Sequence, residues 1–558
     1  MDYKEISEVY EKLESTSSRL EKTKIVSDFL RKIHKDELKD IIYLLEGRIF
    51  PAWDERKIGF SSRSMLKAIS VASGHSFEKV ESLFNKKGDL GIVAEELMKN
   101  KRQATFHSKK LIVKDVLENV RKLAELEGAG TVNKKVGLVT ELLGNATPEE
   151  AKYAVKTVLE NLRVGVSEGI IRDSIAEAFN IDVNEIEKIG DYNADYGEVA
   201  VLAKEGNLES IKLKPGIPFK LMLALPAENA KKVFEDLGKI VQFEYKLDGF
   251  RMTIHNDGKK IVLFTRRLEN VTKQFPDVIE IAKKHINGKN YIVDCEAVGF
   301  DKDKKKYLPF QNVSQRIKRK YDIEQMAKKF PVELNVFDVI YHNGKNLMST
   351  PLKERRELLE KIIDEKKWNI VLTKKLVTDD EKKVGNFFND ALENAMEGLM
   401  AKNYEGNYVP GRYVKGWMKL KNVLEPLDVV IVGAEHGEGK RAGWLTSYII
   451  AIKKGDEFKE IGKVSSGVKE KEANLTYWKM TQMLNPLIIK GSEKGKSVRV
   501  KPKIIIEVTY EEIQKSPKSS SGWSLRFPRV IRLRNDKPLS EISDIEMVKR
   551  IHNSQRKK

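Results

Sequence analysis

The stretch EYKLDGFR, residues 244–251, places one lysine among groups that could help it react. Lys246 lies between Glu244 and the pair Asp248–Gly249, with Arg251 just beyond. A free amine attacks phosphorus well, but a lysine with a pKa near 10.4 is neutral only about 0.04% of the time at pH 7. It therefore needs burial, a cationic neighbour or a metal nearby. The pattern indicates a lysine nucleophile beside a phosphate; the alternative is an exposed hairpin turning at Asp-Gly.

Charged residues further along the chain could serve such a nucleophile. Arg251 and Arg266, the latter in FTRR, offer positive charge that could grip phosphates. Glu296 and Glu397 could hold a ribose hydroxyl, or a Mg²⁺ ion through its waters. The alternative for Glu296 is a solvated carboxylate at a sheet edge.

A third group offers stacking and phosphate contacts. Phe337, in NVFDVIY, could stack on a base, although such a phenylalanine is more often a core residue. Lys419 and Lys421 alternate in WMKLK and would point to one face of a strand, which suits two contacts to one phosphate. A solvated strand face is the alternative. Together, in this order, these residues indicate nucleotide chemistry.

Three regions of different character would position these residues. Apolar residues spaced at three and four predict helices up to about residue 210, with Thr147-Pro148-Glu149-Glu150 as one helix start. Strand and helix patterns then alternate to about residue 423, and short strands with glycine turns follow. We expect a multidomain chain: an all-α domain over 1–215, an α/β domain over 216–423 and a β-barrel of the OB-fold kind over 424–558.

Composition narrows the class of protein. The 558 residues carry a net charge of +19, which favours a polyanionic partner, although a charge-dense thermophile surface would also fit. The single cysteine, Cys295, excludes an internal disulfide framework and a cysteine zinc site, and we expect it in the core. The N-terminus has no signal-peptide pattern and no apolar run approaches a membrane span. We expect a cytoplasmic protein.

One motif is a decoy. GSEKGKS, residues 491–497, is similar to a phosphate-binding P-loop but has three residues between its glycines where the P-loop needs four. The strand-like VRVKPKIIIEV follows it where a P-loop needs a helix. We therefore interpret it as a basic loop.

The order of motifs closely resembles the nucleotidyltransferase motifs of ATP-dependent DNA ligases, of the replicative type found in archaea and eukaryotes. The motifs are KLDGFR (246–251), FTRR (264–267), DCEAVGF (294–300), FDVIYHNG (337–344), EGLMAK (397–402) and WMKLK (417–421). The resemblance continues through LRVGVSEGIIRDSIAEAF (162–179) and KPGIPFKLMLA (214–224) in the helical part, and through IIIEVTYEEIQKSP (504–517) and SGWSLRFPRVIRLRNDK (521–537) at the end. It implies a helical DNA-binding domain, an adenylation domain and an OB-fold domain.

The resemblance implies three-step nick sealing in replication, repair and recombination. Lys246 would attack the α-phosphate of ATP, the AMP would pass to the 5′-phosphate of a nick, and the 3′-hydroxyl would displace AMP. The residues at ATP-binding positions would be Glu244, Arg251, Arg266, Glu296, Phe337, Arg412, Lys419 and Lys421.

The same resemblance implies the metal and C-terminal residues. Glu296 and Glu397 would be the carboxylates for Mg²⁺, with Mn²⁺ as a substitute. A hinge near 422–428 would let the barrel bring its motif to the pyrophosphate or the DNA; the motif residues are Arg529, Arg534, Asp536 and Lys537. The family's arginine before the lysine matching Lys419 falls on Tyr413 here, so a one-residue slip would give that role to Arg412, with Lys415 as the alternative.

The expected partner is nicked double-stranded DNA, held through its phosphates without regard to sequence. Helix starts in SSRSMLKA (61–68) and GVSEGIIRDS (165–174) could supply backbone amides to phosphates, and ordinary capping is compatible with that. Residues 103–106, Gln103-Ala104-Thr105-Phe106, loosely resemble the peptide by which such ligases bind the sliding clamp; an exposed loop is the alternative. We expect a monomer.

Two other classes share part of the pattern. An RNA ligase or a capping guanylyltransferase would carry the lysine motif but usually lacks a helical region of this length. A non-catalytic DNA-binding scaffold should have lost the charged positions that only catalysis requires, and Lys246, Glu296, Glu397, Lys419 and Lys421 are all present. An NAD-dependent bacterial-type ligase would add a cysteine zinc module. Whether ADP, GTP or NAD also serve stays open.

Overall fold

The computed structural model describes residues 1–102, 110–126, 128, 130–317, 319, 322–394, 396–411, 415–421, 424–437, 441, 443–468, 475–492 and 496–555. The chain divides into two compact units, one made of residues 1–381 and 400–419 and the other of residues 382–399 and 420–558. Within the described ranges, every helix is too short or too polar to cross a membrane.

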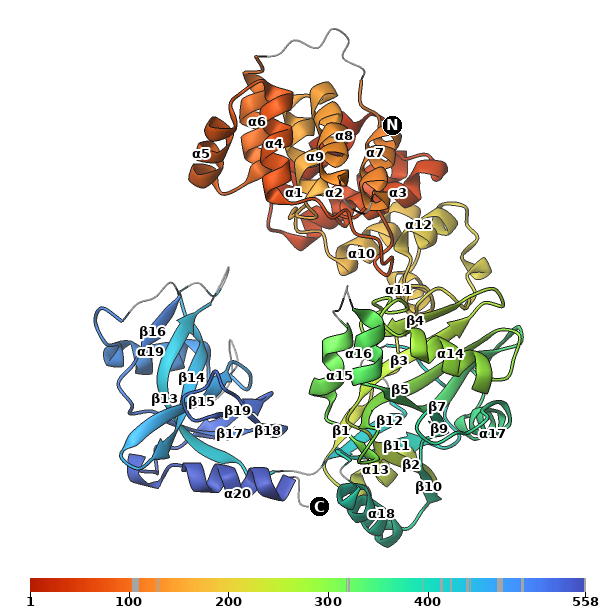
Figure 1. Cartoon of the computed structure of the whole chain (residues 1–558), viewed down its shortest axis with the longest axis vertical. Coiled ribbons are helices and arrows are strands. Elements are labelled where there is room, and N and C mark those ends of the chain that lie inside the picture. Colours follow the sequence, from red (N-terminus) through yellow and green to blue (C-terminus); the bar gives the residue numbers. More distant parts are fainter. Residues whose placement is uncertain are drawn as a thin grey trace. The chain divides into compact units, whose positions relative to one another are not determined.

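The N-terminal region is helical, as predicted (Figure 1). Its helices are α1 (Tyr3–Glu14), α2 (Arg19–Lys32), α3 (Lys35–Leu45), α4 (Ser62–Ser73), α5 (Phe77–Lys87), α6 (Leu90–Lys99), α7 (Val113–Glu125), α8 (Thr131–Asn145), α9 (Pro148–Val158), α10 (Glu168–Phe179), α11 (Val183–Tyr192) and α12 (Tyr196–Lys204). The start of α9 confirms the predicted signal, because Thr147 and Glu150 form a reciprocal capping box around Pro148. One continuous apolar core, from Tyr3 to Leu208, holds these helices together.

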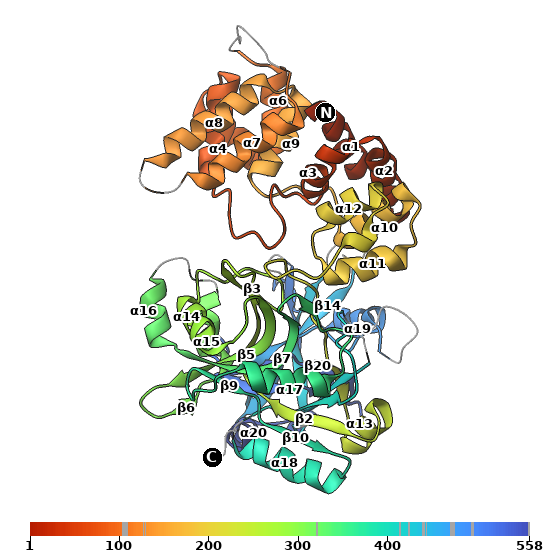
Figure 2. The same ribbon diagram turned by 90° about the vertical axis from the view of Figure 1, so that its right-hand side faces the viewer.

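The following region contains two sheets with flanking helices (Figure 2). The strands are β1 (Leu225–Ala227), β2 (Val241–Lys246), β3 (Phe250–Asn256), β4 (Ile261–Thr265), β5 (Tyr291–Asp301), β6 (Lys306–Tyr307), β7 (Val332–His342), β8 (Lys345–Asn346), β9 (Ile370–Leu372), β10 (Lys375–Thr378), β11 (Gly398–Asn403) and β12 (Trp417–Lys421). The helices are α13 (Ala230–Leu237), α14 (Pro276–His285), α15 (Phe310–Ile317), α16 (Ile323–Lys329), α17 (Leu352–Ile362) and α18 (Glu381–Glu393). This region confirms the predicted alternation of strands and helices.

The two sheets divide the strands around the lysine motif. One sheet has the order β1-β12-β11-β2-β10, and the other has the order β4-β3-β5-β7-β8, with β6 on β5 and β9 on β7. Strand β2 therefore ends in one sheet and β3 begins in the other, so the short link over residues 247–249 carries the chain between sheets. The exposed-hairpin interpretation of Asp-Gly is excluded, because β2 and β3 are not partners.

The C-terminal region is rich in strands, as predicted. It contains β13 (Leu427–His436), β14 (Leu445–Lys454), β15 (Glu457–Val464), β16 (Ser497–Arg499), β17 (Ile505–Thr509), β18 (Glu512–Lys515), β19 (Trp523–Arg526) and β20 (Arg529–Leu533), with α19 (Tyr477–Leu484) and α20 (Ile545–Gln555). The main sheet has the order β15-β14-β13-β17-β20, with β16 on β13, and β18 pairs with β19 separately. All these pairings are antiparallel.

Two further sequence predictions are confirmed. Cys295 is buried in β5 among apolar neighbours, and burial raises the pKa of its thiol far above the ordinary value. The P-loop decoy is followed by strand β16, beginning at Ser497, where a P-loop would have a helix.

Candidate active site

Lys246 is the last residue of β2, and the strand before it is fully buried. Side chains alternate along a strand, so Gln242, Glu244 and Lys246 project from one face. The next turn needs Gly249, because a Cβ at that position would lie 2.5 Å from the carbonyl oxygen of Ala297 and 3.0 Å from Cγ of Glu296. The glycine thus allows the link that follows half-buried Lys246 to pass close to β5.

Asp248 links the same turn to the start of a helix. Its Oδ2 accepts a hydrogen bond from the backbone N–H of Phe310 at 3.3 Å, and Phe310 is the first residue of α15. The first N–H groups of a helix have no partner within the helix, so a carboxylate there is favourable. Asp248 therefore joins the lysine turn to a helix start.

Arg251 lies in a buried network on β3. Its Nε and Nη2 donate to the carboxylate of Asp294 at 3.0 and 2.6 Å, and its Nη1 donates to the carbonyl of Met222 at 2.6 Å. The hydroxyl of Tyr408 accepts from Nη2 at 3.0 Å and donates to Asp294 at 3.2 Å. Burial acts to lower the pKa of Arg251, but electrostatic attraction to Asp294, Tyr408 and Glu296 and the hydrogen bond to Asp294 together raise the pKa above the ordinary value. Arg251 is held as a permanent cation.

Glu244 lies in a second buried network. Its Oε2 is 2.6 Å from Nζ of Lys402 on β11, and its Oε1 accepts from Nε2 of Gln242 at 2.6 Å. The Lys402 ammonium lies 4.4 Å from the ring centroid of Phe337 and 4.5 Å from that of Trp417. The structure thus brings together Glu244 and Phe337, two predicted site residues, through one buried cation.

Glu296, Arg266 and Lys419 are three further predicted site residues. Glu296 is half-buried on β5, directly opposite Arg251 on β3. Arg266 is exposed in the turn after β4. Lys419 is half-buried on β12, which confirms the predicted WMKLK strand, and shares a strand face with Lys421.

Lys421 and Glu397 pair with each other in the second unit. Nζ of Lys421 lies 3.1 Å from Oε2 of Glu397 and 3.1 Å from Oε2 of Glu511. The other predicted metal carboxylate, Glu296, belongs to the first unit. Within the described ranges, no three His, Cys, Asp or Glu side chains gather as a metal cage.

The C-terminal motif residues converge on Asp428 at the start of β13. Arg534 Nη1 donates to both oxygens of Asp428 at 2.8 and 2.9 Å, and Lys537 Nζ donates at 2.6 Å. Arg534 also pairs with exposed Asp536 at 3.0 Å, whereas Arg529 is exposed at the start of β20. The motif is therefore tied to the last residue of the predicted hinge, which lies at the start of β13.

Some sequence predictions lie outside the described residues. Arg412, residues 103–106 and the first two residues of the predicted hinge, 422–423, are among them, while the alternative Lys415 is exposed. Sequence reasoning missed Asp294, Lys402, Tyr408 and Asp428. Two of them lie within quoted motifs, Asp294 in DCEAVGF and Lys402 at the end of EGLMAK, so their motif positions were the available signal.

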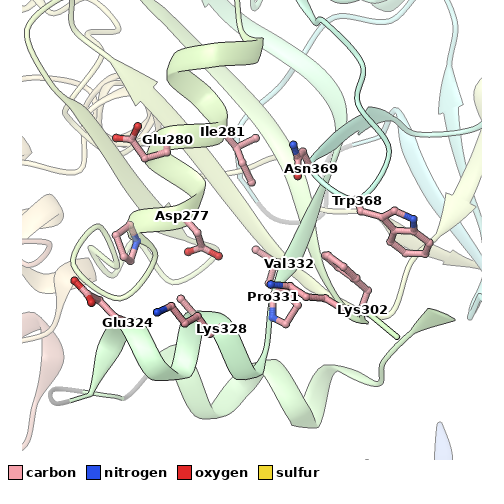
Figure 3. Close-up of a pocket in the computed structure, with 13 residues that line it drawn as sticks. Asp277, Glu280, Ile281, Lys302, Glu324, Lys328, Pro331, Val332, Trp368 and Asn369 are labelled. Carbon is pink, nitrogen blue, oxygen red and sulfur yellow. The ribbon is translucent and has the colours of Figure 1, made fainter. Parts of the chain in front are cut away.

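A separate pocket opens on the other sheet (Figure 3). It has a volume of about 430 Å³ and is lined by side chains from α14, α16, the ends of β5 and β7 and the segment before β9, including Asp277, Glu280, Phe300, Lys328 and Trp368. None of the predicted site residues lines it.

Comparison with known proteins decides the family. A family model described as the ATP dependent DNA ligase domain matches residues 221–421, the DNA ligase N terminus model matches residues 2–176, and the ATP dependent DNA ligase C terminal region model matches residues 441–537. The chain belongs to the ATP-dependent DNA ligases. It therefore uses ATP to seal nicks in DNA.

Relatives of this DNA ligase cover its whole length. It is 46% identical over 564 residues to the DNA ligase of Nanoarchaeum equitans, covering 100% of this chain and 99% of the relative. It is 41% identical over 560 residues to the DNA ligase of Thermococcus onnurineus, covering 100% and 98%. A solved structure named Pmar-Lig_PreS3 covers 95% of this chain and 99% of its own, with a TM-score of 0.52 and 18% identity, which is a likeness of fold.

Proposed function

We propose that Lys246 is the nucleophile that this ligase uses to take AMP from ATP. The neutral Nζ would attack the α-phosphorus, forming a P–N bond while the bond to pyrophosphate breaks and the amine loses its proton. The AMP would then pass to the 5′-phosphate of a nick, and the 3′-hydroxyl would displace it. The observation that carries this proposal is the placement of half-buried Lys246 at the end of β2, followed by a link that packs on β5 with no room for a Cβ at Gly249.

The remaining predicted residues would hold the nucleotide. Positive charges near Lys246 would favour its neutral form and stabilise the charge that develops on the phosphates. Phe337 would stack on the base, and Glu296 would hold the ribose. The proposed set is Glu244, Arg251, Arg266, Glu296, Phe337, Arg412, Lys419 and Lys421. Buried Arg251 is the best supported cation of this set, because Asp294 fixes its position.

We also propose that Mg²⁺, or Mn²⁺ in its place, acts with the nucleotide. Mg²⁺ is usually held by one or two carboxylates together with waters and phosphate oxygens, so a site without a protein cage of three ligands fits it. Glu296 and Glu397 would be its carboxylates. When bound, the ion would neutralise charge on the phosphates.

We propose three domains for this ligase: a DNA-binding domain over residues 1–215, an adenylation domain over 216–423 and an OB-fold domain over 424–558. The antiparallel sheet β15-β14-β13-β17-β20 with α19 and α20 supports an OB-fold. Movement about residues 422–428 would bring Arg529, Arg534, Asp536 and Lys537 to the pyrophosphate or the DNA. For Arg534 and Lys537 this would require release from Asp428.

This ligase would act as a monomer on chromosomal DNA, where it would hold the duplex around a nick. Of the two helix starts, the one at Ser167 is the better candidate for a phosphate contact. The Ser61 hydroxyl already caps α4, whereas the Ser167 side chain makes no capping bond to α10. Binding of the sliding clamp through residues 103–106 is a further proposal, carried by sequence alone.

Mapping of the AMP group tests the proposed nucleophile. Enzyme incubated with ATP and Mg²⁺ is digested under conditions that preserve the P–N bond, and its peptides are analysed by mass spectrometry. We expect the AMP mass on Lys246. AMP on another lysine of the motif-bearing strands, such as Lys419, would overturn the assignment.

A further inference from the structure

The hydroxyl of Tyr408 lies where three separate segments of the chain meet. It donates to Oδ2 of Asp294 on β5 at 3.2 Å. It accepts from Nη2 of Arg251 on β3 at 3.0 Å and from the backbone N–H of Met222 at 3.2 Å. A phenol hydroxyl has one proton to donate and can accept two hydrogen bonds. All three capacities are used, and Tyr408 is buried.

The guanidinium of Arg251 is almost as fully used. Of its five N–H groups, that of Nε and one on Nη2 bind Asp294. The second N–H of Nη2 binds Tyr408, and one N–H of Nη1 binds the carbonyl of Met222. Within the described part of the chain, one N–H of Nη1 is left over. Arg251 therefore offers a substrate one N–H, in place of the two parallel N–H groups that a bidentate phosphate clamp would use.

The ring and the backbone of Tyr408 are fixed independently of the hydroxyl. The ring meets Trp417 edge to face at 5.6 Å and Phe219 at 6.1 Å. The backbone N–H donates to the carbonyl of Met348 at 2.8 Å. Removal of the oxygen alone would therefore leave the ring in place and change only the hydrogen-bond network.

The hydroxyl keeps its proton in this network. Burial, together with the charge of Asp294, holds the pKa of Tyr408 well above its ordinary value. A buried polar network in which every member is satisfied is rigid, whereas loss of one member leaves its partners unpaired. Loss of the Tyr408 hydroxyl would free one N–H of Arg251 and also the N–H of Met222, whose carbonyl is another acceptor of Arg251.

We propose that Tyr408 is a positioning residue that orients the guanidinium of Arg251 for the transfer of AMP to the enzyme. The inference rests on the proposed function, in which Arg251 is a cation of the nucleotide site. Asp294 neutralises the guanidinium, while Tyr408 and Met222 fix the direction of its last N–H. A donor that stabilises charge in a transition state does so best when it is oriented beforehand.

The test removes the oxygen and keeps the ring. Single-turnover formation of lysyl-AMP by Tyr408→Phe is measured over a range of ATP concentrations, on enzyme freed of AMP by pyrophosphate. We expect the maximal rate to fall at least about fivefold while the KM for ATP changes little, because orientation acts on the transition state. A smaller fall in the folded variant would overturn the proposal.

A double-mutant cycle shows whether Tyr408 acts through Arg251. Arg251→Lys keeps a cation beside Asp294 but lacks the planar set of N–H groups that Tyr408 orients. In that background, Tyr408→Phe should cost less than about twofold in maximal rate. A loss as large as in the wild-type background would refute the proposal, because Tyr408 would then act independently of Arg251.

Tyr291→Phe is the matched control. Tyr291 is buried at the start of β5, and its hydroxyl donates to the carbonyl of Ala282 at 3.3 Å. This variant also loses one buried hydroxyl, so it should keep the wild-type rate of lysyl-AMP formation. A fall as large as that of Tyr408→Phe would contradict a specific role for Tyr408.

A measurement on the wild-type enzyme covers a failure of Tyr408→Phe to fold. The Nε–H of Arg251, assigned by the loss of its NMR signal in Arg251→Lys, should exchange with water at least about tenfold more slowly than that of exposed Arg63. Equal rates would show that the guanidinium is not held. If wild-type enzyme takes no label from ATP, the proposed function fails; if Lys246 is labelled and Tyr408→Phe is as fast as wild type, this inference alone fails.

Discussion

The guanidinium of Arg251 grips the carboxylate of Asp294 through Nε and Nη2, at 3.0 and 2.6 Å, and Asp294 is fully buried. The geometry is bidentate and charge-assisted, the strongest kind of side-chain hydrogen bond. It places a permanent cation on β3, two residues after Gly249 of the lysine turn. The consequences of breaking this pair can be measured.

Asp294→Ala should destabilise the fold strongly. It leaves the buried Arg251 charge uncompensated, and breaking such a pair costs about 3–5 kcal/mol. Urea denaturation of the full chain measures the effect. Glu405→Ala is the control, because Glu405 pairs with Lys353 at an exposed site, where a loss of about 0–1 kcal/mol is expected. Equal effects of the two variants would contradict the role given to Asp294.

Gly249→Ala should damage both stability and adenylation. The new Cβ would lie 2.5 Å from the carbonyl oxygen of Ala297, and backbone cannot move aside as a flexible side chain can. Overpacking of this kind costs about 1–3 kcal/mol, and the displaced turn carries Lys246. Unfolding free energy and the rate of lysyl-AMP formation are the two measurements.

Gly137→Ala is the control for that variant. Gly137 lies within α8, and a Cβ there would meet nothing within 4 Å. Alanine in a helix interior is favoured over glycine by about 1 kcal/mol, so this variant should be slightly more stable and fully active. Wild-type adenylation by Gly249→Ala would show that the close approach of β2 to β5 is not needed.

Acid should weaken the fold through His255. Its Nδ1 accepts from the backbone N–H of Gly216 at 3.2 Å, so the neutral ring donates from Nε2 to Oγ1 of Thr253 at 3.0 Å. Burial lowers the pKa of His255 from 6.5 to about 3. Between these values the unfolded chain binds more protons than the folded one, so stability is fully present above pH 6.5 and falls as the pH drops toward 3.

The size of that effect is measurable. One such group contributes a loss of up to about 1.4 kcal/mol for each pH unit below 6.5. Urea denaturation at pH 7.5, 6 and 5 should show a shallower pH dependence for His255→Gln than for wild type. His34→Gln serves as the control for removal of an exposed histidine. Parallel pH curves for wild type and His255→Gln would contradict the assignment.

Binding of nicked duplex should depend steeply on salt. The chain carries a net charge of +19, and a protein that makes 6–10 phosphate contacts loses about 10³–10⁵ in affinity between 50 and 200 mM salt. Fluorescence anisotropy of a labelled nicked duplex, without ATP, measures this. A change of less than about tenfold would mean that phosphates contribute little.

The strands that carry the proposed site were predictable because their sequence signals are local. Short runs rich in apolar, β-branched and aromatic residues mark β2, β3 and β5, and the residue types around Lys246 indicate phosphate chemistry. The link between β2 and β3 was not predictable in the same way, since Asp-Gly between two strands is also the pattern of a hairpin. Only the sheet order shows that the link crosses from one sheet to the other.

Long-range partners of the site residues were also beyond the sequence. Glu244 and Lys402 are far apart in the chain, and nothing in either motif shows that their side chains form a buried pair. Asp428 was expected only as part of a hinge, yet it binds both Arg534 and Lys537. Such pairings depend on how strands are ordered in a sheet, which local periodicity does not determine.

Covalent labelling tests the central claim most directly. Wild type and Lys246→Ala, first freed of AMP by pyrophosphate, are incubated with α-³²P-ATP and Mg²⁺ without DNA and separated by denaturing electrophoresis. We predict label on wild type, none on Lys246→Ala, and discharge of the wild-type label by nicked duplex carrying a 5′-phosphate. Absence of label on AMP-free wild type, or equal label on Lys246→Ala, would contradict the account.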